Sequence, residues 1–307
     1  MRIGLPGTGS TVDKLVAQAQ RAENDGFSSL WYASATAGDP LVAMAIVGRA
    51  TTKIELGTSV LQTYTTHPVL MATRARAVAD AIGAKDRFVL GVGPSHQPVI
   101  EGMFGLPYDH AGRHTEEYIS ILAPLLRGEA VKFEGEDFRV TVPAGRVSEG
   151  SEVQLLVSAL APRLLRVAGE QTAGTILWMG NARSIETHVA PLLRKAAANA
   201  GRGEPRIVAG LPVAVHDDVD EARNTAAKTF AGYGFLPNYQ RILAHGGVDG
   251  PADAAIVGNE ASVASQIEDL FSAGATDVWA APFPVGDDRT ASRERTYALL
   301  KELAAAS

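Results

Sequence analysis

The chain has 307 residues, 46% of them hydrophobic and 20% charged, which is the composition of an ordinary globular protein. Its formal net charge is −6 without a basic cluster, which argues against binding to nucleic acid or to an anionic membrane surface. The absence of cysteine excludes disulfides, thiolate nucleophiles and cysteine-based metal sites.

The start of the chain, MRIGLPGTG, lacks the apolar segment of a signal peptide. No uninterrupted apolar run reaches the ~18 residues that a transmembrane helix needs. We therefore expect no membrane-spanning segment and a cytoplasmic location.

Short apolar runs typical of strands alternate along the chain with longer helical patterns. Strands are predicted at residues 2–6, 29–32, 54–60, 87–92, 153–158, 175–179, 206–216 and 277–283. Helices are predicted at residues 11–26, 40–50, 68–82, 113–126, 162–170, 184–200, 219–230, 262–274 and 289–305. Strands that are each followed by a helix favour a (β/α)8 TIM barrel, with residues 1–307 forming a single domain.

Three longer segments interrupt this alternation. Residues 93–112 follow the fourth strand and residues 232–259 come late in the chain, after the seventh strand. Residues 128–150 contain KFEGEDFRV, which alternates like a small hairpin around Gly135. Long loops in compact domains are usually functional or mobile, and barrels carry their active sites at the carboxyl ends of the strands. We therefore expect the insertions after strands four and seven to border a site.

The predicted strand ends carry aromatic, small and neutral polar residues, and few acids. They read PGT at 6–8, WYAS at 31–34, SVLQ at 59–62, GPSH at 93–96, SAL at 158–160, MGN at 179–181 and APF at 281–283. This set is poorly suited to hydrolysis by paired carboxylates or to a metal site. It suits a flat, partly apolar ligand held by backbone groups and hydroxyls.

Single residues in this set allow two interpretations. Trp31 ends a strand, so its ring either fills the core or faces the site, whereas Trp178 and Trp279 are expected to fill the core. His96 either contacts a ligand or caps a loop. His110 and His114 are four residues apart, but no carboxylate motif accompanies them, so no metal is expected.

Two predicted helix starts, at residues 158–162 and 180–184, follow neighbouring strands. Free N–H groups at such starts bind anions such as phosphate, although ordinary capped helix starts look the same in sequence.

Taken together, these residues resemble the luciferase-like monooxygenase superfamily, and more closely its coenzyme F420-dependent oxidoreductase branch. The stretches that carry the resemblance are GTSVLQTYTTHPVLMATRARAV, FVLGVGPSHQPVIEGMFGLPYDHAGRHTEEYISIL, VKFEGEDFRV and AGTILWMGN. The resemblance implies a barrel with insertions, a homodimer, and F420 or alternatively FMN at the carboxyl ends of the strands.

The resemblance also implies roles for single residues. A non-prolyl cis peptide at Ser59–Val60 would form a bulge behind the cofactor ring, with Gln62 and Tyr64 at the mouth. Residues expected to flank the ring are Gly93, Pro94, Ser95 and His96. Residues expected to hold the cofactor side chain or phosphate are Ser158, Ala159, Leu160, Ala161, Gly180 and Asn181.

The F420 tail is polyanionic, so basic residues are expected at its rim. Arg289 and Arg293 either serve this role or belong to a solvated helix face.

The chain departs from the sugar-phosphate dehydrogenases of this family, which carry an Asp-His pair after strand two and a Glu after strand four. Ala33-Ser34 and Pro94 stand at those places here, so a sugar-phosphate substrate is disfavoured and the proton donor is unassigned. The candidates for a catalytic role are Trp31, Ser34 and His96.

The favoured function is hydride transfer between F420 and a small organic substrate. The alternatives are an FMN-dependent monooxygenase with a separate reductase and a non-catalytic flavin- or deazaflavin-binding protein.

Overall fold

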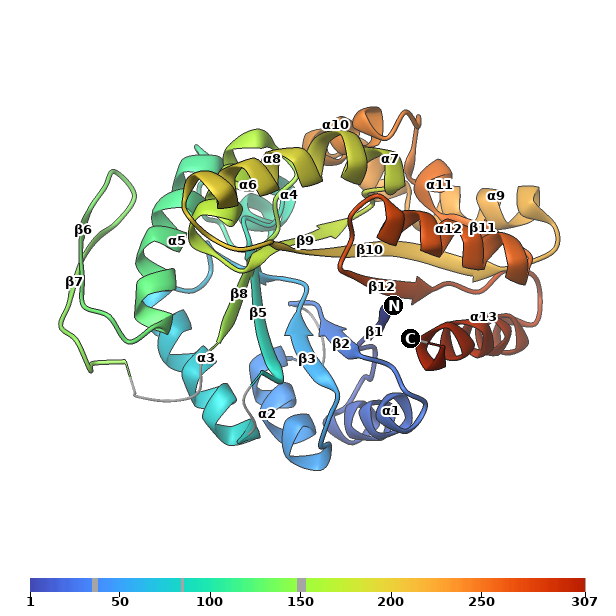
Figure 1. The fold of residues 1–307 in the computed structure, drawn as a ribbon, viewed down its shortest axis with the longest axis horizontal. Coiled ribbons are helices and arrows are strands. Elements are labelled where there is room, and N and C mark those ends of the chain that lie inside the picture. The colour runs from blue at the N-terminus through green and yellow to red at the C-terminus, as the bar shows by residue number, and fades with distance from the viewer. Residues whose placement is uncertain (35–37, 84–85, 148–152, 307) are drawn as a thin grey trace.

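A closed parallel sheet lies at the centre of the molecule, with helices around it (Figure 1). The computed structural model describes residues 1–34, 38–83, 86–147 and 153–306. Its strands are β1 (Arg2–Pro6), β2 (Ser29–Tyr32), β3 (Glu55–Thr58), β4 (Leu61–Gln62), β5 (Phe88–Gly93), β6 (Val131–Glu134), β7 (Arg139–Val142), β8 (Gln154–Val157), β9 (Gly174–Trp178), β10 (Arg206–Val215), β11 (Ile256–Gly258) and β12 (Asp277–Pro282).

The helices cover the outside of this sheet. They are α1 (Val12–Asn24), α2 (Pro40–Ala50), α3 (Pro68–Ile82), α4 (Gln97–Gly102), α5 (Ala111–Leu126), α6 (Pro162–Gln171), α7 (Ala182–Ser184), the π-helix η1 (Ile185–Val189), α8 (Ala190–Asn199), α9 (Val219–Thr229), the 3-10 helix η2 (Ala231–Phe235), α10 (Pro237–His245), α11 (Pro251–Ala254), α12 (Glu260–Ser272) and α13 (Arg289–Ala305). Side chains cap several of these starts; Asp39, for example, accepts a hydrogen bond from the N–H of Leu41 before α2.

The sheet closes into a ring because β9 pairs with β10 at one end of the strand order and β12 pairs with β1. Around the ring the order is β1, β2, β3, β5, β8, β9, β10 and β12, and every pairing in it is parallel. The predicted (β/α)8 barrel is therefore confirmed. The expectation of a single domain stays a prediction.

The predicted elements match the observed ones closely, with two instructive differences. The predicted third strand, residues 54–60, stops at Thr58, and its continuation β4 pairs with β5 only after an interruption. The predicted sixth helix, residues 184–200, is divided into α7, η1 and α8.

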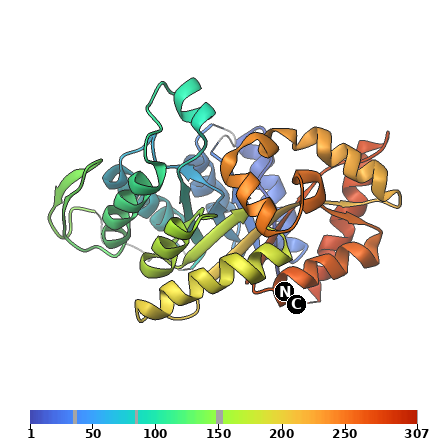
Figure 2. The same cartoon turned by 90° about the horizontal axis from the view of Figure 1, so that it is seen from above.

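Both predicted insertions are found at the carboxyl ends of their strands, at the top of Figure 2. The first contains α4, and the second, which follows α9, contains most of η2 and all of α10, α11 and β11, none of which was predicted. The predicted hairpin around Gly135 is β6 and β7, which pair antiparallel and project beside α5 (Figure 1). Residues 148–150 of the predicted 128–150 segment lie outside the described residues.

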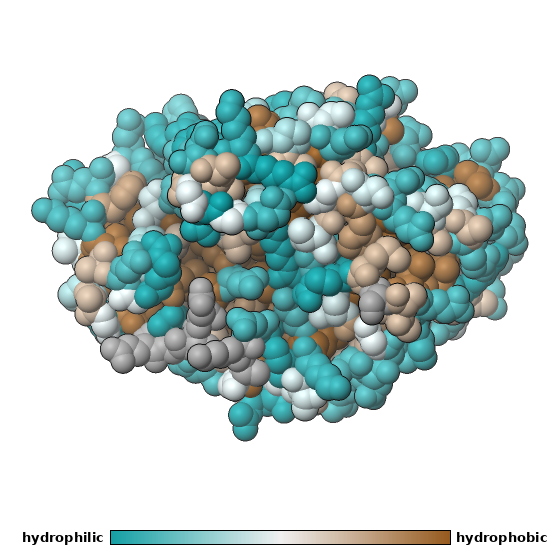
Figure 3. All heavy atoms as spheres, in the orientation of Figure 1, coloured by the Kyte–Doolittle hydropathy of each residue, from teal (hydrophilic) through white to brown (hydrophobic). Residues whose placement is uncertain are grey.

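The interior of the barrel is solid. Trp31 and Trp279 are buried there among Val89, Leu156, Ile176 and Val208. The two indoles fit because the neighbouring strands carry glycine: a Cβ atom at Gly57 or Gly210 would overlap the ring of Trp31 or Trp279. The visible outer surface is mostly hydrophilic (Figure 3). No helix in the described part of the chain is long and apolar enough to cross a membrane.

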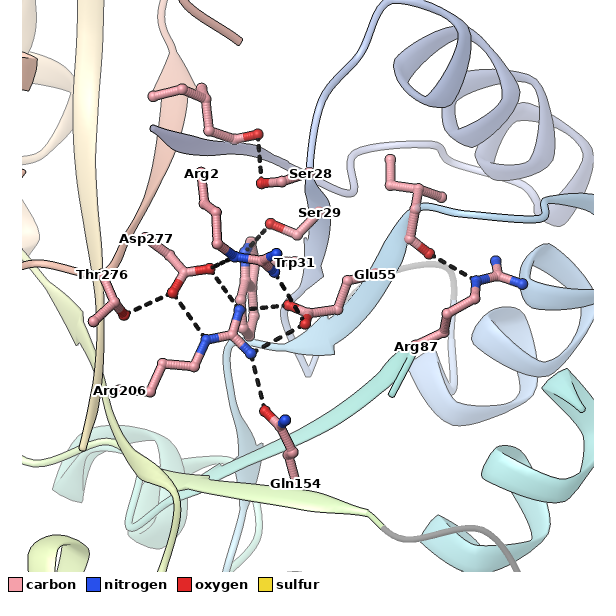
Figure 4. Close-up of polar contacts among 12 residues, drawn as sticks. Arg2, Ser28, Ser29, Trp31, Glu55, Arg87, Gln154, Arg206, Thr276 and Asp277 are labelled. Atoms are coloured by element: carbon pink, nitrogen blue, oxygen red, sulfur yellow. Dashed lines mark hydrogen bonds and ion pairs between the residues drawn. The ribbon is translucent and has the colours of Figure 1, made fainter. Parts of the chain in front are cut away.

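An ion network closes the amino-terminal end of the barrel (Figure 4). Arg206 on β10 donates to both carboxylate oxygens of Glu55 on β3, at 2.6 and 3.1 Å, and to both of Asp277 on β12, at 2.6 and 2.9 Å. It also donates to Gln154 on β8 at 3.1 Å, and Arg2 on β1 bonds the same two carboxylates at 2.7 and 3.1 Å. One guanidinium therefore ties several strands of the ring together.

The two carboxylates are almost fully buried, with side chains 10% and 2% exposed for Glu55 and Asp277. Burial alone would raise the pKa of Asp277, but the hydrogen bonds and charges of Arg206 and Arg2 lower it below its ordinary value. A carboxyl group whose pKa is lowered by folding stabilises the fold at pH values above its ordinary pKa, near 3.9. This stabilisation is lost as the pH falls through the lowered pKa of the folded state.

We expect Arg206→Met to lower the free energy of unfolding by about 3–5 kcal/mol, because it leaves two buried carboxylates without their main partner. Urea or thermal unfolding at neutral pH measures this loss. Arg289→Met is the matched control, since that exposed side chain forms no hydrogen bond or ion pair within the described residues. Equal unfolding free energies for the two variants would contradict the role given to Arg206.

Candidate active site

The carboxyl end of the ring carries a backbone interruption at the predicted place. The Ser59–Val60 peptide bond is cis, as the resemblance implied, and it lies between β3 and β4. The hydroxyl of Thr58 spans the interruption: it donates to the carbonyl of Gly91 at 2.7 Å and accepts from the N–H of Gly91 at 2.8 Å. A side chain thereby satisfies backbone groups where the regular strand pairing is broken.

Val60, Gly93 and Ser158 form a floor above the buried interior. Val60 packs on the interior cluster that contains the two indoles. A Cβ atom at Gly93 would lie 2.9 Å from Cβ of Ser158 and 3.0 Å from a methyl of Val60. The missing side chain at Gly93 thus lets three strand ends approach one another closely.

The next predicted residues lie together on one side of this floor. Gln62 donates to the hydroxyl of Ser95 at 3.1 Å, and Tyr108 donates to the carbonyl of Ser95 at 2.8 Å. Ser95 has a φ of 63°, a left-handed conformation that is uncommon outside glycine and concentrates at functional sites. The loop containing Pro94 and Ser95 is therefore held in one shape.

Tyr64 supports the first insertion. Its ring stacks on His114, with centroids 3.9 Å apart, and its hydroxyl donates to the carbonyl of Asp109 at 3.2 Å. These contacts use both its ring face and its polar group, so Tyr64 holds the loop before α5 in place.

His96 meets an aromatic wall contributed by the second insertion. Its ring lies 5.6 Å from that of Tyr239 on α10, and Tyr239 packs edge-on against Tyr233 at 5.0 Å. Tyr233 in turn contacts Trp178 at the end of β9, at 5.9 Å. The mouth is therefore bordered by rings from segments more than a hundred residues apart in the chain.

The electrostatics of this wall favour neutral groups. Burial lowers the pKa of His96 and raises that of Tyr239, so the imidazole is neutral and the phenol protonated near pH 7. Neither side chain makes a hydrogen bond within the described residues. No group of His, Asp or Glu in the described part of the chain could hold a metal ion.

The turn after β8 leads into an uncapped helix. Ala161 is the N-cap residue of α6 and provides no side-chain hydrogen bond, so the first N–H groups of this ten-residue helix lack a side-chain acceptor. The hydroxyl of Ser158 makes no hydrogen bond within the described residues. Ala159 is fully buried and its N–H is bonded to Thr175 at 3.3 Å, which leaves it no free group for a ligand.

The turn after β9 is built differently. Asn181 caps α7 by accepting from the N–H of Ser184 at 3.0 Å, and Gly180 before it is buried. Arg183 on this turn is exposed, and its guanidinium makes no hydrogen bond or ion pair within the described residues. A single unpaired cation therefore stands beside this turn.

Two sequence-based interpretations need correction. Trp31 does not face the mouth: it is fully buried, its indole donates to Ser29 at 2.9 Å, and Arg206 lies 5.8 Å from its ring at the amino-terminal end. Trp178, expected in the core, is instead half-buried at the mouth and stacks on Trp279. A strand alternates its side chains between two faces, and the sequence did not reveal which face met the interior.

Ser34 lies two residues after the end of β2 in a half-buried position, and the three residues after it lie outside the described residues. Arg293, a sequence-based candidate for tail binding, lines a separate cavity of about 610 Å³ between α1 and α13. That cavity contains none of the predicted cofactor residues, and its other arginine, Arg21, is paired with Glu294 at 2.8 Å.

Sequence reasoning missed Tyr239 and Arg183. The only available signal for Tyr239 was the aromatic run GYGFLPNY in the second insertion. Arg183 looked like any other arginine at a helix start.

Comparison with known proteins places this geometry in context. The family model for luciferase-like monooxygenases matches residues 2–295. The 5,10-methylenetetrahydromethanopterin reductase of Methanopyrus kandleri is 26% identical over 316 residues, which cover 87% of this chain and 88% of that protein.

Solved structures share the fold. The coenzyme F420-dependent tetrahydromethanopterin reductase from Methanopyrus kandleri has a TM-score of 0.76 at 21% identity, and the match covers 97% of this chain and 95% of that one. The oxygenating constituent of 3,6-diketocamphane monooxygenase from Pseudomonas putida, in complex with FMN, has a TM-score of 0.71 at 17% identity, covering 99% and 97%.

Proposed function

Because the chain belongs to the luciferase-like monooxygenase family, we propose that it is a coenzyme F420-dependent oxidoreductase acting on a small organic substrate. The observation that carries the proposal is the pairing of the floor with two neighbouring turns, one that leads into the uncapped start of α6 and one that carries the unpaired Arg183. The floor is Val60, Gly93 and Ser158, and the turns are 158–161 and 180–184. This combination suits a planar ring with an anionic tail.

The residues present fit such a group. The cis Ser59–Val60 bulge would support the ring from below, and Gly93 would allow it to approach the backbone. Gln62, Pro94, Ser95 and His96 would surround its edge. The uncapped N–H groups of α6, with Ser158 and Asn181, would hold the phosphate. When bound, the deazaflavin supplies the hydride chemistry, and the chain supplies binding, orientation and proton control.

Two observations favour F420 over FMN. The relative from Methanopyrus kandleri with a solved structure is an F420-dependent enzyme. In addition, the unpaired Arg183 beside the second turn suits a tail with several negative charges. FMN remains the alternative, because a structural neighbour holds FMN on the same fold. The family supports an enzyme, so a non-catalytic binding protein is the weakest alternative.

The proton that accompanies hydride transfer to a carbonyl has three candidate donors. The phenol of Tyr239 is protonated at neutral pH and has no hydrogen-bond partner in the described structure. His96 lies against it and can relay a proton from solvent. The hydroxyl of Ser34 stays a candidate from the sequence. Since none of the three is acidic, the site suits a substrate that needs no strong acid.

We also propose a homodimer formed through α2 and the start of α3. Val42 and Ile46 are four residues apart on one face of α2 and are 57% and 46% exposed, and Leu70 on the adjacent α3 is 50% exposed. A cytoplasmic location stays a prediction.

Titration of the apo-protein with each cofactor tests the proposed function. We expect F420 to bind with a change in its fluorescence and FMN to bind more weakly. Tight binding of FMN without any response to F420 would instead identify the FMN-dependent alternative. Oxygenation of an organic substrate in the presence of reduced FMN would then separate a monooxygenase from a non-catalytic binding protein, because reduced FMN consumes oxygen on its own.

Replacement of Arg183 tests the proposed contact with the tail. We expect Arg183→Gln to weaken F420 binding about tenfold at low salt, because one charge-assisted contact is lost. The difference from wild type should shrink as salt is added. Arg293→Gln is the matched control, being an exposed arginine outside the proposed site. Equal effects of the two changes on F420 binding would contradict the assignment of Arg183 to the site.

Light scattering at micromolar concentration tests the proposed dimer surface. Ile46→Lys should convert a dimer into a monomer, because it places a charge in the centre of the apolar contact. Val219→Lys, a change at an exposed apolar residue on α9, should leave the mass unchanged. A wild-type protein that is monomeric would refute this part of the proposal.

A further inference from the structure

The carboxyl-terminal end of α10 contacts both turns that the proposed function assigns to the cofactor tail. These turns, 158–161 and 180–184, follow different strands of the barrel. The last residue of α10 and the two that follow it, His245 to Gly247, belong to the second insertion and are not part of the barrel sheet.

The first contact runs through His188. Its Nε2 lies 2.9 Å from the carbonyl oxygen of Leu160, so this nitrogen carries the proton and donates to the first turn. The other side of the ring lies flat on His245, with centroids 3.8 Å apart and planes 11° apart. His188 is only 7% exposed, and it lies in the π-helix η1. Single π-helical turns are rare and often occur at functional sites.

The second contact runs through Asn181. Its side-chain amide donates to the carbonyl of Gly246 at 3.1 Å, while its oxygen caps the N–H of Ser184 at 3.0 Å. Gly246 is needed for this approach, because a Cβ atom there would lie 2.6 Å from the Asn181 side-chain oxygen. A Cβ atom at Gly247 would likewise lie 2.8 Å from the guanidinium of Arg183.

We propose that His188 is a positioning residue for the cofactor tail, an inference that rests on the proposed function. Through its bond to Leu160 and its stack on His245, it fixes the first turn relative to the end of α10. Asn181 fixes the second turn to the neighbouring residue, Gly246. The spacing between the two turns is thus set by α10, and a tail that spans both turns would depend on it.

Simple core packing is a weaker explanation of His188. A packing residue at a site this deeply buried needs no polar atom, and a buried donor is costly unless it is bonded. Here the bond goes to a backbone carbonyl in the very turn that leads to the uncapped start of α6. Loss of the imidazole would leave that carbonyl without this partner and release the turn.

The test compares two ligands, F420 and a deazaflavin riboside that lacks the phosphate and the rest of the tail. We expect His188→Ala to weaken F420 binding about tenfold and to leave binding of the tail-free compound within twofold. His188→Gln should recover most of the loss, because its amide can donate to Leu160. His67→Asn, a change at an exposed histidine before α3, serves as the control.

A second pair of variants keeps the test decisive if His188→Ala does not fold. Gly246→Ala should give the same selective loss of F420 binding, because its methyl group pushes Asn181 away. Gly232→Ala in the same insertion, where a Cβ atom would meet nothing within 4 Å, should bind both ligands normally. Thermal unfolding of each variant checks that the fold is retained.

The outcomes separate the inference from the proposed function. Equal losses for both ligands, or no loss for either, in variants of a wild type that binds F420 would overturn the positioning role alone. A wild type that binds no phosphate-bearing cofactor, neither F420 nor FMN, would overturn the proposed function and this inference with it.

Discussion

The barrel depends on the hydrogen bonds and ion pairs made by the guanidinium of Arg206. A closed parallel sheet needs its strands held in register at both ends, and at the amino-terminal end this chain uses charge. Arg206 reaches carboxylates on β3 and β12 and an amide on β8, and Arg2 adds β1 through the same carboxylates. Breaking a buried ion pair is far more costly than breaking one at the surface. The buried carboxylates Glu55 and Asp277 therefore stabilise the fold, and they lie at the end of the barrel opposite the mouth.

The placement of these charges at the amino-terminal end is consistent with the neutral chemistry of the carboxyl end. The interior between the two ends is filled by Trp31 and Trp279, so no ligand can descend into the barrel. The proposed ligand would instead lie on the surface formed by Val60, Gly93 and Ser158. The surroundings of that surface are aromatic rings, amides and hydroxyls. A site of this kind binds and orients a group that brings its own reactivity, which is the reason for assigning it to a cofactor.

The sequence was informative wherever a local rule determined the structure. Helix α3 begins at Pro68 and ends before Gly83 in the left-handed conformation, and both boundaries were predicted. The hairpin around Gly135 and the cis bond at Ser59–Val60 were also predicted, the latter only through the family resemblance. For Trp31 the sequence left a core-filling and a site-facing ring open, because the direction of a side chain depends on the tilt of the whole barrel. Tyr239, Arg183 and His188 could not be assigned at all, because contacts between distant segments place them.

One helix of the second insertion, α10, reaches both ends of the proposed ligand. Tyr239 on the first half of α10 contacts His96 at the mouth, where a substrate would meet the ring. The last residue of the same helix, His245, stacks on His188, and Gly246 bonds Asn181, where the tail would end. A short helix is stiff over this length. Tail binding that orders the end of α10 must therefore also fix Tyr239, so the same contacts that hold the cofactor would complete the wall of the substrate site.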